Sequence, residues 1–341
     1  MKASHLTVYS ISHFFVDFSC AFLLFSVISG SPDFALCVLL YNFCAFALQM
    51  PLGLLADAWN RNRIIAATGC FLVAFAYIVP LPLAAAVIAG TGNALFHLGG
   101  GIDTLNHSRK KAFALGIFVS PGAVGLYLGT LLGKAGTAST ATGIIPLIAT
   151  GILILLICPI PGHGTHSENV PLSAETTVRV KWLIPLFLVV VLRSYMGMNQ
   201  QFDWKNQWHW GFILVLALAL GKMVGGLLMD RLGAKTASVY TLVTAAVLYL
   251  FSGHPIPGIL AVFLFNMTMP VTLWAVAQIT PGMKGFTFGL LTFGLFMGYL
   301  PSAFGLPSLL VNYPLYSLVT LGSLFLLLMV YRAFRKGNLS C

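Results

Sequence analysis

The chain has 341 residues, of which 58% are hydrophobic and only 8% are charged, and its mean hydropathy is +0.93. About a quarter of the residues in a soluble domain are charged, so this composition excludes a water-exposed globular surface and indicates an integral membrane protein. The net charge of +10 does not indicate nucleic-acid binding, because the basic residues lie in short clusters between apolar runs.

Twelve apolar runs predict membrane-spanning helices, because a helix needs about 20 apolar residues to cross the hydrocarbon. The first run has no basic segment followed by a cleavage site, so we expect it to be a retained helix and not a signal peptide. In chain order the runs are 7–29, 34–56, 64–80, 83–105, 112–133, 142–160, 182–200, 209–230, 236–252, 257–279, 285–306 and 315–333.

The lysines and arginines between these runs predict the orientation. They gather on one side of the expected topology, whereas the other side carries only Lys134 and Lys205. Basic loops stay in the cytoplasm, so we expect both termini to be cytoplasmic. The polar segment 161–181, which contains both glutamates of the chain, is predicted to be a linker. We therefore expect an all-α membrane protein of twelve helices in two six-helix bundles, 1–160 and 182–341.

A short motif of glycine, three residues and aspartate, followed by a basic turn, occurs twice. Its residues are Gly53, Asp57 and Arg61 in the first copy and Gly226, Asp230 and Arg231 in the second. The two aspartates are 230 − 57 = 173 residues apart, close to half the chain, which is typical of two structural repeats. The motif is either a conformational latch between neighbouring helices or an ordinary helix-ending turn with topological charge.

Together with twelve helices and a central linker, this motif resembles the signature of the major facilitator superfamily, Gly-x-x-x-Asp-Arg-x-Gly-Arg-Arg after helix 2, with a weaker copy after helix 8. Here the second copy matches better, because Ala58, Asn60 and Asn62 replace the usual Arg, Gly and basic residue of the first. The resemblance implies secondary transport by alternating access and a central cavity lined by helices 1, 4, 7 and 10.

Two glycine-rich segments carry a second resemblance. The segment 116–129 in predicted helix 5 looks like the Gly/Pro motif of facilitator-family antiporters. With the segment 92–100 in helix 4, it resembles the fosmidomycin-resistance branch of drug exporters. The alternative is that these small residues allow close helix packing.

Polar side chains at membrane depth are costly and usually mark a transport pathway. The candidates lie on the four helices that the resemblance places around the cavity. They are His13 and Asp17 in helix 1, Asn93 and His97 in helix 4, Arg193 in helix 7, and Asn266 and Trp274 in helix 10.

Asp17 is the only acidic residue that we predict near mid-membrane. A partly desolvated carboxylate can exchange a proton as a cavity opens to each side, so we expect proton coupling through Asp17 with His13 as a relay. Two alternatives stay open, a fixed ion pair between Asp17 and Arg193 and a contact with substrate alone. Arg193 itself either binds an anionic substrate through its forked donors or snorkels to the outer surface.

His97 is either a substrate hydrogen-bond partner or a satisfied interior histidine. His13, Asp17 and His97 could together present nitrogen and oxygen ligands to a divalent ion. We nevertheless predict no metal site, because the set offers three borderline ligands from two helices without a cysteine or methionine motif. We expect no cofactor.

The chain is therefore expected to be a secondary transporter of a small solute in the cytoplasmic membrane. It has no HExxH, GxSxG or Walker motif, so neither an enzyme nor an ATP-driven pump is predicted. A lipid flippase, an uncoupled facilitator or a receptor on the same fold are the alternatives. The expected partners are a small-molecule substrate, protons and membrane lipids, with no nucleic acid, and we expect a monomer.

Overall fold

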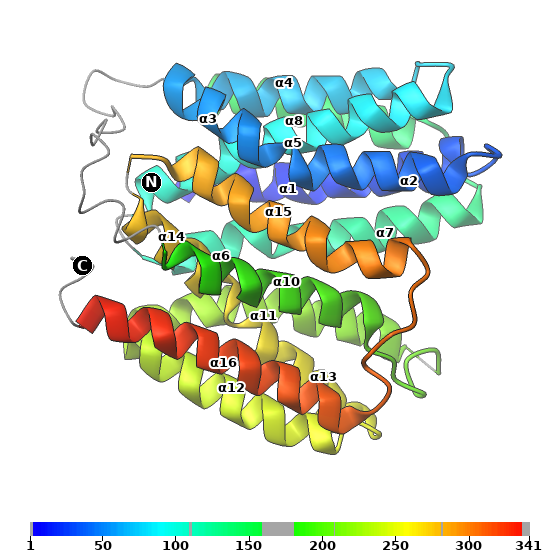
Figure 1. Ribbon diagram of the computed structural model, residues 1–341. Coiled ribbons are helices and arrows are strands. Elements are labelled where there is room, and N and C mark those ends of the chain that lie inside the picture. Colours follow the sequence, from blue (N-terminus) through cyan, green and yellow to red (C-terminus); the bar gives the residue numbers. More distant parts are fainter. Residues whose placement is uncertain (1–2, 109–110, 159–180, 208, 281, 336–341) are drawn as a thin grey trace. The chain divides into compact units, whose positions relative to one another are not determined.

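A computed structural model describes residues 3–108, 111–158, 181–207, 209–280 and 282–335 (Figure 1). Residues 161–180 of the predicted linker lie outside these ranges. The described residues form helices and no strands, and they divide into two compact units. Unit 1 comprises Met1–Arg109, Pro121–Ser167 and Met283–Phe293, and unit 2 comprises Lys110–Ser120, Glu168–Gly282 and Gly294–Cys341.

Unit 1 is built around α1, which packs against α5, α7 and α8, while α4 packs against α5 and α8. Backbones approach closely in this unit, since a Cβ atom at Gly125 or Gly129 would strike the carbonyl oxygen of Phe14 or Phe18. The helices of unit 1 are α1 (Ala3–Leu23), α2 (Phe34–Asn42), α3 (Gln49–Trp59), α4 (Asn62–Ala76), α5 (Pro82–His107), α7 (Pro121–Ala135) and α8 (Ala141–Ile157).

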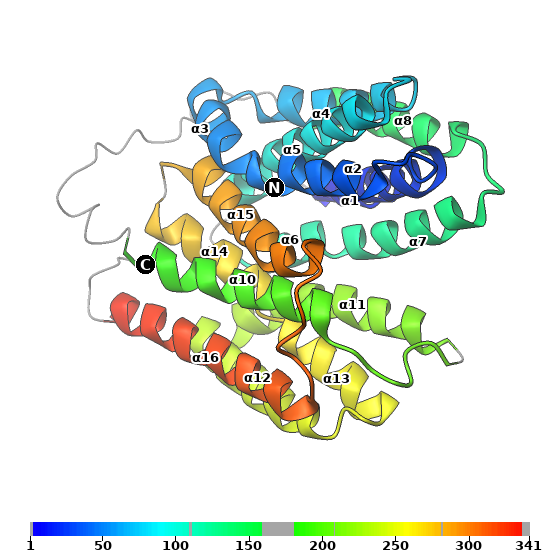
Figure 2. The same ribbon diagram turned by 45° about the vertical axis from the view of Figure 1, so that its right-hand side comes forward.

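Unit 2 is built around α11, which packs against α6, α13 and α14, while α12 packs against α13 and α16 (Figure 2). Its helices are α6 (Phe113–Val119), α10 (Leu183–Asn199), α11 (Trp210–Leu232), α12 (Ala234–Leu250), α13 (Pro255–Asn266), α14 (Met269–Ile279) and α16 (Tyr313–Arg335). One further helix, α15 (Lys284–Ala303), contributes its first part to unit 1 and the rest to unit 2.

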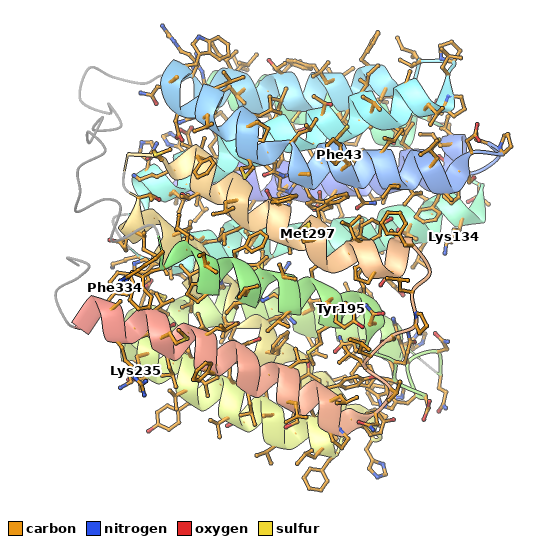
Figure 3. All side chains as sticks on the ribbon, viewed as in Figure 1. Phe43, Lys134, Tyr195, Lys235, Met297 and Phe334 are labelled. Atoms are coloured by element: carbon orange, nitrogen blue, oxygen red, sulfur yellow. The ribbon has the colours of Figure 1, made fainter. Side chains whose placement is uncertain are left out.

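The outward side chains of both units are largely apolar, as a lipid-facing surface requires. Phe43 is 42% exposed and Met297 is 39% exposed (Figure 3). In unit 2, Lys235 at the beginning of α12 and Phe334 near the end of α16 lie at the same end of the helices. The predicted topology also places these two positions on one side of the membrane.

Between one and three consecutive helical segments occupy each of the twelve apolar runs. Eight are long and apolar enough to cross a membrane, by length and composition. The four shorter apolar helices are Asn62–Ala76, Ala141–Ile157, Leu183–Asn199 and Ala234–Leu250. The number of helices that cross the membrane, and the side on which the termini lie, stay predictions.

Some of the predicted runs are interrupted in ways that prolines explain. The run 112–133 is divided at Ser120, since Pro121 has no N–H to donate to the preceding turn. The run 257–279 is divided at Met267 and Thr268, because Pro270 likewise cannot donate to the carbonyl of Asn266. Two π-helical segments, Leu24–Ile28 and Phe43–Ala47, were not predicted.

The two units differ from the expected bundles in two short segments. Residues 110–120, from the first bundle, belong to unit 2, and residues 283–293, from the second bundle, belong to unit 1. The two segments are related by one offset, since 283 − 110 = 173 and 293 − 120 = 173. This offset equals that of the two loop aspartates, as an internal repeat requires. The functional division into the bundles 1–160 and 182–341 stays a prediction.

Candidate functional site

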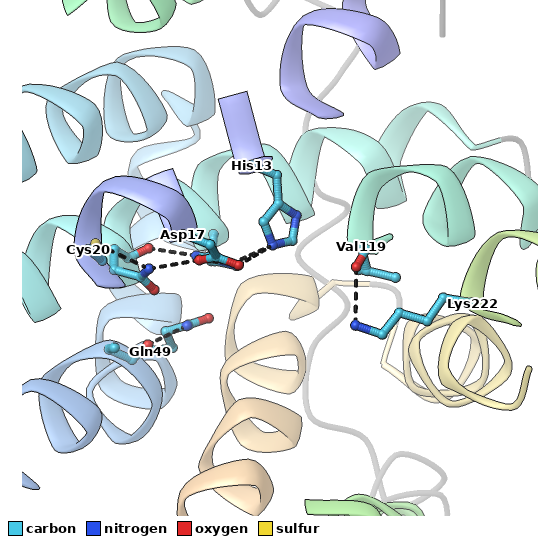
Figure 4. Close-up of polar contacts among 9 residues, drawn as sticks. His13, Asp17, Cys20, Gln49, Val119 and Lys222 are labelled. Atoms are coloured by element: carbon cyan, nitrogen blue, oxygen red, sulfur yellow. Dashed lines mark hydrogen bonds and ion pairs between the residues drawn. The ribbon is translucent and has the colours of Figure 1, made fainter. Parts of the chain in front are cut away.

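Four polar side chains from α1 and α5 meet inside unit 1. Figure 4 labels two of them, His13 and Asp17. Asp17 lies one helical turn beyond His13, and the His13 Nε2 atom is 3.2 Å from the Asp17 Oδ2 atom. Asn93 donates its side-chain amide to the Asp17 Oδ1 atom at 3.1 Å, and His97 Nε2 lies 3.7 Å from the same oxygen. The sequence predicted both i, i+4 pairs, and the structure brings them together.

The hydrogen bonds indicate where the proton of this cluster lies. His97 Nδ1 is 2.9 Å from the carbonyl oxygen of Asn93, which can only accept, so Nδ1 carries the hydrogen. In neutral His97 the Nε2 atom is then an acceptor, and His13 Nε2, 2.9 Å away, must donate to it. This assignment gives one N–H of His13 two acceptors, His97 Nε2 and the Asp17 carboxylate.

The cluster is buried but not sealed. The side chains of His13, His97 and Asp17 are 6%, 11% and 20% exposed. Asn93 also donates to the thiol of Cys20 at 3.7 Å, and Cys20 in turn contacts the hydroxyl of Tyr41 from α2. A carboxylate inside a membrane helix is thus surrounded by donors and remains the most exposed member of its group.

Gly122 of α7 forms the wall of this cluster. A Cβ atom at that position would strike both the Asp17 Oδ2 and the His13 Nε2 atoms. Within the glycine-rich segment 116–129, Gly125 and Gly129 likewise allow α7 to approach α1. These contacts favour close packing as the reason for the glycines in α7.

The three ligand atoms of His13, Asp17 and His97 lie within 4.8 Å of one another, so this set could hold a divalent ion. The two imidazole nitrogens are, however, at hydrogen-bond distance from each other. A hydrogen bond between the two nitrogens satisfies that spacing.

A second buried carboxylate was not predicted as a site. Asp103 of α5 is 6% exposed and accepts the hydroxyl of Tyr9 at 2.6 Å and the side-chain amide of Asn62 at 2.9 Å. The sequence contained one indication of a polar face to which Tyr9 belongs. Tyr9, His13 and Asp17 are spaced four residues apart and so share one face of α1.

In unit 2, Arg193 of α10 is buried, with 7% of the residue exposed. Its guanidinium donates to Thr268 Oγ1 at 2.8 Å, to Met269 Sδ at 3.4 Å and to Thr272 Oγ1 at 3.5 Å. All three acceptors are neutral, and the Nε atom has no hydrogen-bond partner among the described residues. The Asp17–Arg193 pair would join residues of the two units and stays a prediction.

The other two candidates in unit 2 have contacts of their own. The Asn266 side-chain amide donates to the Val262 carbonyl oxygen at 2.8 Å, one turn earlier in α13. The Trp274 ring lies 5.8 Å from the ring of Phe334, measured between centroids. Their role as cavity residues stays a prediction.

The repeated motif places each aspartate against the N-terminal end of another helix of its unit. Asp57 accepts the backbone N–H groups of Gly285 at 2.8 Å and Phe286 at 2.9 Å, at the first turn of α15. Gly53 allows this contact, since a Cβ atom there would strike the Gly285 carbonyl oxygen. A carboxylate at a helix N-terminus satisfies free N–H groups and complements the helix dipole.

The second copy repeats this geometry in unit 2. Asp230 accepts the backbone N–H groups of Ala112 at 2.7 Å and Phe113 at 3.1 Å, at the first turn of α6. A Cβ atom at Gly226 would lie 2.6 Å from the Ala112 carbonyl oxygen. Arg61 and Arg231 are exposed, and among the described residues neither forms an ion pair with these aspartates. Their part in a latch stays a prediction.

No family model and no curated protein matches the chain. Among solved structures it is similar to the human organic anion transporter MFSD10 (TETRAN), with a TM-score of 0.71 and 15% identity over 95% of this chain and 99% of that one. It is similar to the E. coli fucose:proton symporter FucP, with a TM-score of 0.64 and 12% identity over 96% and 97% of the two chains. For the proton:xylose symporter XylE the TM-score is 0.68, with 12% identity over 96% and 95%.

The predicted all-helical transporter fold is therefore confirmed, whereas the twelve spans and the side of the termini stay predictions. These structures cover nearly the whole of both chains in each comparison, and all three are transporters. At identities of 12–15% the likeness concerns the fold. The chain therefore shares the fold of these structures, among which XylE is described as a member of the major facilitator superfamily.

Proposed function

We propose that this protein is a secondary active transporter that moves a small solute across the cytoplasmic membrane and couples that movement to protons. The observation that carries the proposal is the buried cluster of His13, Asp17, Asn93 and His97 in a chain with a transporter fold. Two of the similar structures are proton symporters, but that likeness concerns fold, so the support for coupling is the cluster.

The topology proposed with this function has twelve spans, with both termini in the cytoplasm. The four shorter apolar helices would then cross the membrane together with the eight longer ones. Substrate would bind between two halves that rock about it, as in alternating access. His13, Asp17, Asn93 and His97 from one half, and Arg193, Asn266 and Trp274 from the other, are the residues we propose for binding and coupling.

The cluster offers a two-state response to protonation. With one proton in place, the His13 N–H is shared between His97 and Asp17. A second proton on His97 Nε2 would place two N–H groups against each other at 2.9 Å, so that contact must break. The new N–H would turn toward the Asp17 Oδ1 atom, which is 3.7 Å away. Proton uptake would thus exchange a histidine–histidine bond for a histidine–aspartate ion pair.

The surroundings of the cluster leave Asp17 and the two histidines as the groups that respond. From α1 and α2 the other titratable side chains are Cys20 and Tyr41, both neutral when protonated. From α7 the cluster meets Gly122, and from α5 it meets Asn93, neither of which titrates. A proton entering this part of unit 1 would therefore be taken up by the His13–Asp17–His97 group.

The two loop aspartates are proposed to be latches for the transport cycle. Each holds the first turn of a helix through two charge-assisted hydrogen bonds. Each such contact can form in one conformation and be released in another, because it depends on the position of the helix end. The alternative, an ordinary helix-ending turn, predicts no effect on conformation when the carboxylate is removed.

The proposal is tested in two steps. A thermal-shift screen of the purified protein with metabolites and amphipathic drugs, at two pH values, identifies a solute that stabilises the folded state. Proteoliposomes with an imposed pH gradient should then accumulate that solute, and a protonophore should abolish the accumulation. Equilibration without accumulation would show an uncoupled facilitator, and movement of lipid alone would show a flippase.

A further inference from the structure

The interior of unit 2 holds a positive charge that no carboxylate in the described part of that unit neutralises. Arg193 is 7% exposed and has two threonine hydroxyls and a methionine sulfur as hydrogen-bond acceptors. Its Nε atom is buried without a partner among the described residues. A buried charge that has only neutral partners is costly, so an anion that approached it would stabilise this arrangement.

The acidic residues of this unit are engaged elsewhere. Those that the structure describes in unit 2 are Asp203 and Asp230. Asp230 accepts the first N–H groups of α6, and Asp203 is exposed in the segment between α10 and α11, where it interacts with Tyr313. Within the described part of unit 2, the counter-charge of Arg193 is therefore not a protein carboxylate.

Helix ends do not neutralise Arg193. Its shortest hydrogen bond, at 2.8 Å, is to Thr268, which lies between the C-cap of α13 and the first residue of α14. The negative end of one helix and the positive end of the next meet there and largely offset each other. The charge that an anion would meet at this break is therefore that of the guanidinium itself.

The guanidinium of Arg193 indicates which kind of anion would bind to it. A guanidinium presents parallel N–H donors that match the two oxygens of a carboxylate, and one arginine forms one such fork. The unpartnered Nε–H and a neighbouring Nη–H form one edge of this fork. Nη1 donates to Thr272 and Nη2 to Thr268, and these bonds fix the orientation of the guanidinium.

We infer that Arg193 is the carboxylate-binding residue of this protein and that its substrates are small organic anions. This inference rests on the proposed transport function and names its substrate class. The carboxylate that binds Arg193 could belong to a free organic acid or to the side chain of Asp17 in unit 1. The inference commits to the free acid.

The test measures binding alone, on the purified protein in detergent. Thermal stability is measured against increasing concentrations of three carboxylates, acetate, benzoate and naphthoate, each compared with its neutral amide. At least one acid should stabilise the protein more than its amide does. In Arg193→Gln its binding should weaken about 10- to 100-fold, as expected for hydrogen bonds to a charged group. Three acids that bind no better than their amides would overturn the inference.

Two control variants accompany Arg193→Gln. Lys235→Gln removes a positive charge from an exposed position of the same unit and should bind the acid as the unchanged protein does. Arg193→Lys keeps the charge without the fork and should bind with intermediate affinity, which covers the case in which Arg193→Gln does not fold. Equal affinities of Arg193→Gln and Lys235→Gln would also contradict the inference.

Asp17→Asn separates the two sources of carboxylate. If the acid site is free, this variant binds the acid with unchanged affinity. If Asp17 already occupies it, the acid binds only in Asp17→Asn, and that result overturns the inference. Binding that depends on Arg193 without gradient-driven transport would refute the transport function instead, so the two failures are distinguishable.

Discussion

The Nε2 atoms of His13 and His97 lie 2.9 Å apart, and the partner of His97 Nδ1 makes His13 the donor. This contact joins α1 to α5 inside unit 1 and uses the same N–H that faces the Asp17 carboxylate. A single proton therefore determines the hydrogen bonds of all three side chains, which is the property a proton-coupling group needs.

The first prediction concerns the acceptor in that pair. His97→Leu leaves the His13 N–H without its nitrogen acceptor and should lower the free energy of unfolding by about 1–3 kcal/mol. His97→Gln offers a side-chain oxygen at a similar reach and should cost less. Thermal unfolding of both variants in detergent checks this order. Equal losses in the two variants would mean that the contact is not a hydrogen bond on which stability depends.

The second prediction concerns Gly122. Gly122→Ala places a Cβ atom against Asp17 and His13, so it should destabilise the protein by about 1–3 kcal/mol and lower transport. Gly197→Ala is the matched control, because Gly197 is also helical and has nothing within 4 Å of an added Cβ atom. The control should be neutral or more stable. A Gly122→Ala protein with the stability and transport of Gly197→Ala would show that the cluster tolerates displacement.

The third prediction concerns the latches. Asp57→Ala and Asp230→Ala each remove a carboxylate from a helix N-terminus, an interaction worth up to about 2 kcal/mol. Both variants should transport more slowly and should favour the state that is open at the cytoplasmic end, where the predicted topology places both loops. A loss of up to about 2 kcal/mol changes the ratio of the two conformational states by up to about 30-fold.

Buried Cys20, which contacts Asn93 of the cluster, provides a probe for this shift. With the other five cysteines replaced by serine, a membrane-impermeant maleimide should label Cys20 faster from the cytoplasmic face in both aspartate variants. Asp33→Ala, at an exposed position before α2, serves as the control. Labelling rates that match this control would leave the helix-ending turn as the better interpretation of the motif.

Much of the fold could be predicted because it follows from hydropathy and repetition. The apolar runs mark the helices, and the spacing of Asp57 and Asp230 marks the repeat. The breaks at Ser120 and at Thr268 follow from nearby prolines and could also have been read. The π-helical segments could not, since they arise from packing and leave no pattern in the sequence.

The candidate site was predicted in part. Spacing placed His13 with Asp17 and Asn93 with His97, because residues four apart share a helix face. It could not show that the two pairs meet, since that depends on the packing of α1 against α5. The partners of Asp57 were also hidden, because they are backbone N–H groups, which every residue but proline carries.

The environment of Arg193 could not be predicted from the sequence either. The sequence left snorkelling and anion binding open, because both need a long basic side chain in a helix. The structure describes a buried guanidinium held by Thr268, Met269 and Thr272, three residues with no recognisable motif. A threonine hydroxyl can accept a hydrogen bond from an arginine or donate one to a carbonyl oxygen of its own helix. The sequence alone does not distinguish these two cases.

The most direct test of the account is the transport phenotype of Asp17→Asn in proteoliposomes, with Asp33→Asn as the matched control. Asparagine keeps the shape of the side chain and an oxygen that accepts from His13, but it has no negative charge to pair with a protonated His97. The account predicts that Asp17→Asn still exchanges solute at equal concentrations but no longer accumulates it against a gradient when a pH difference is imposed. Full gradient-driven accumulation by Asp17→Asn would contradict it.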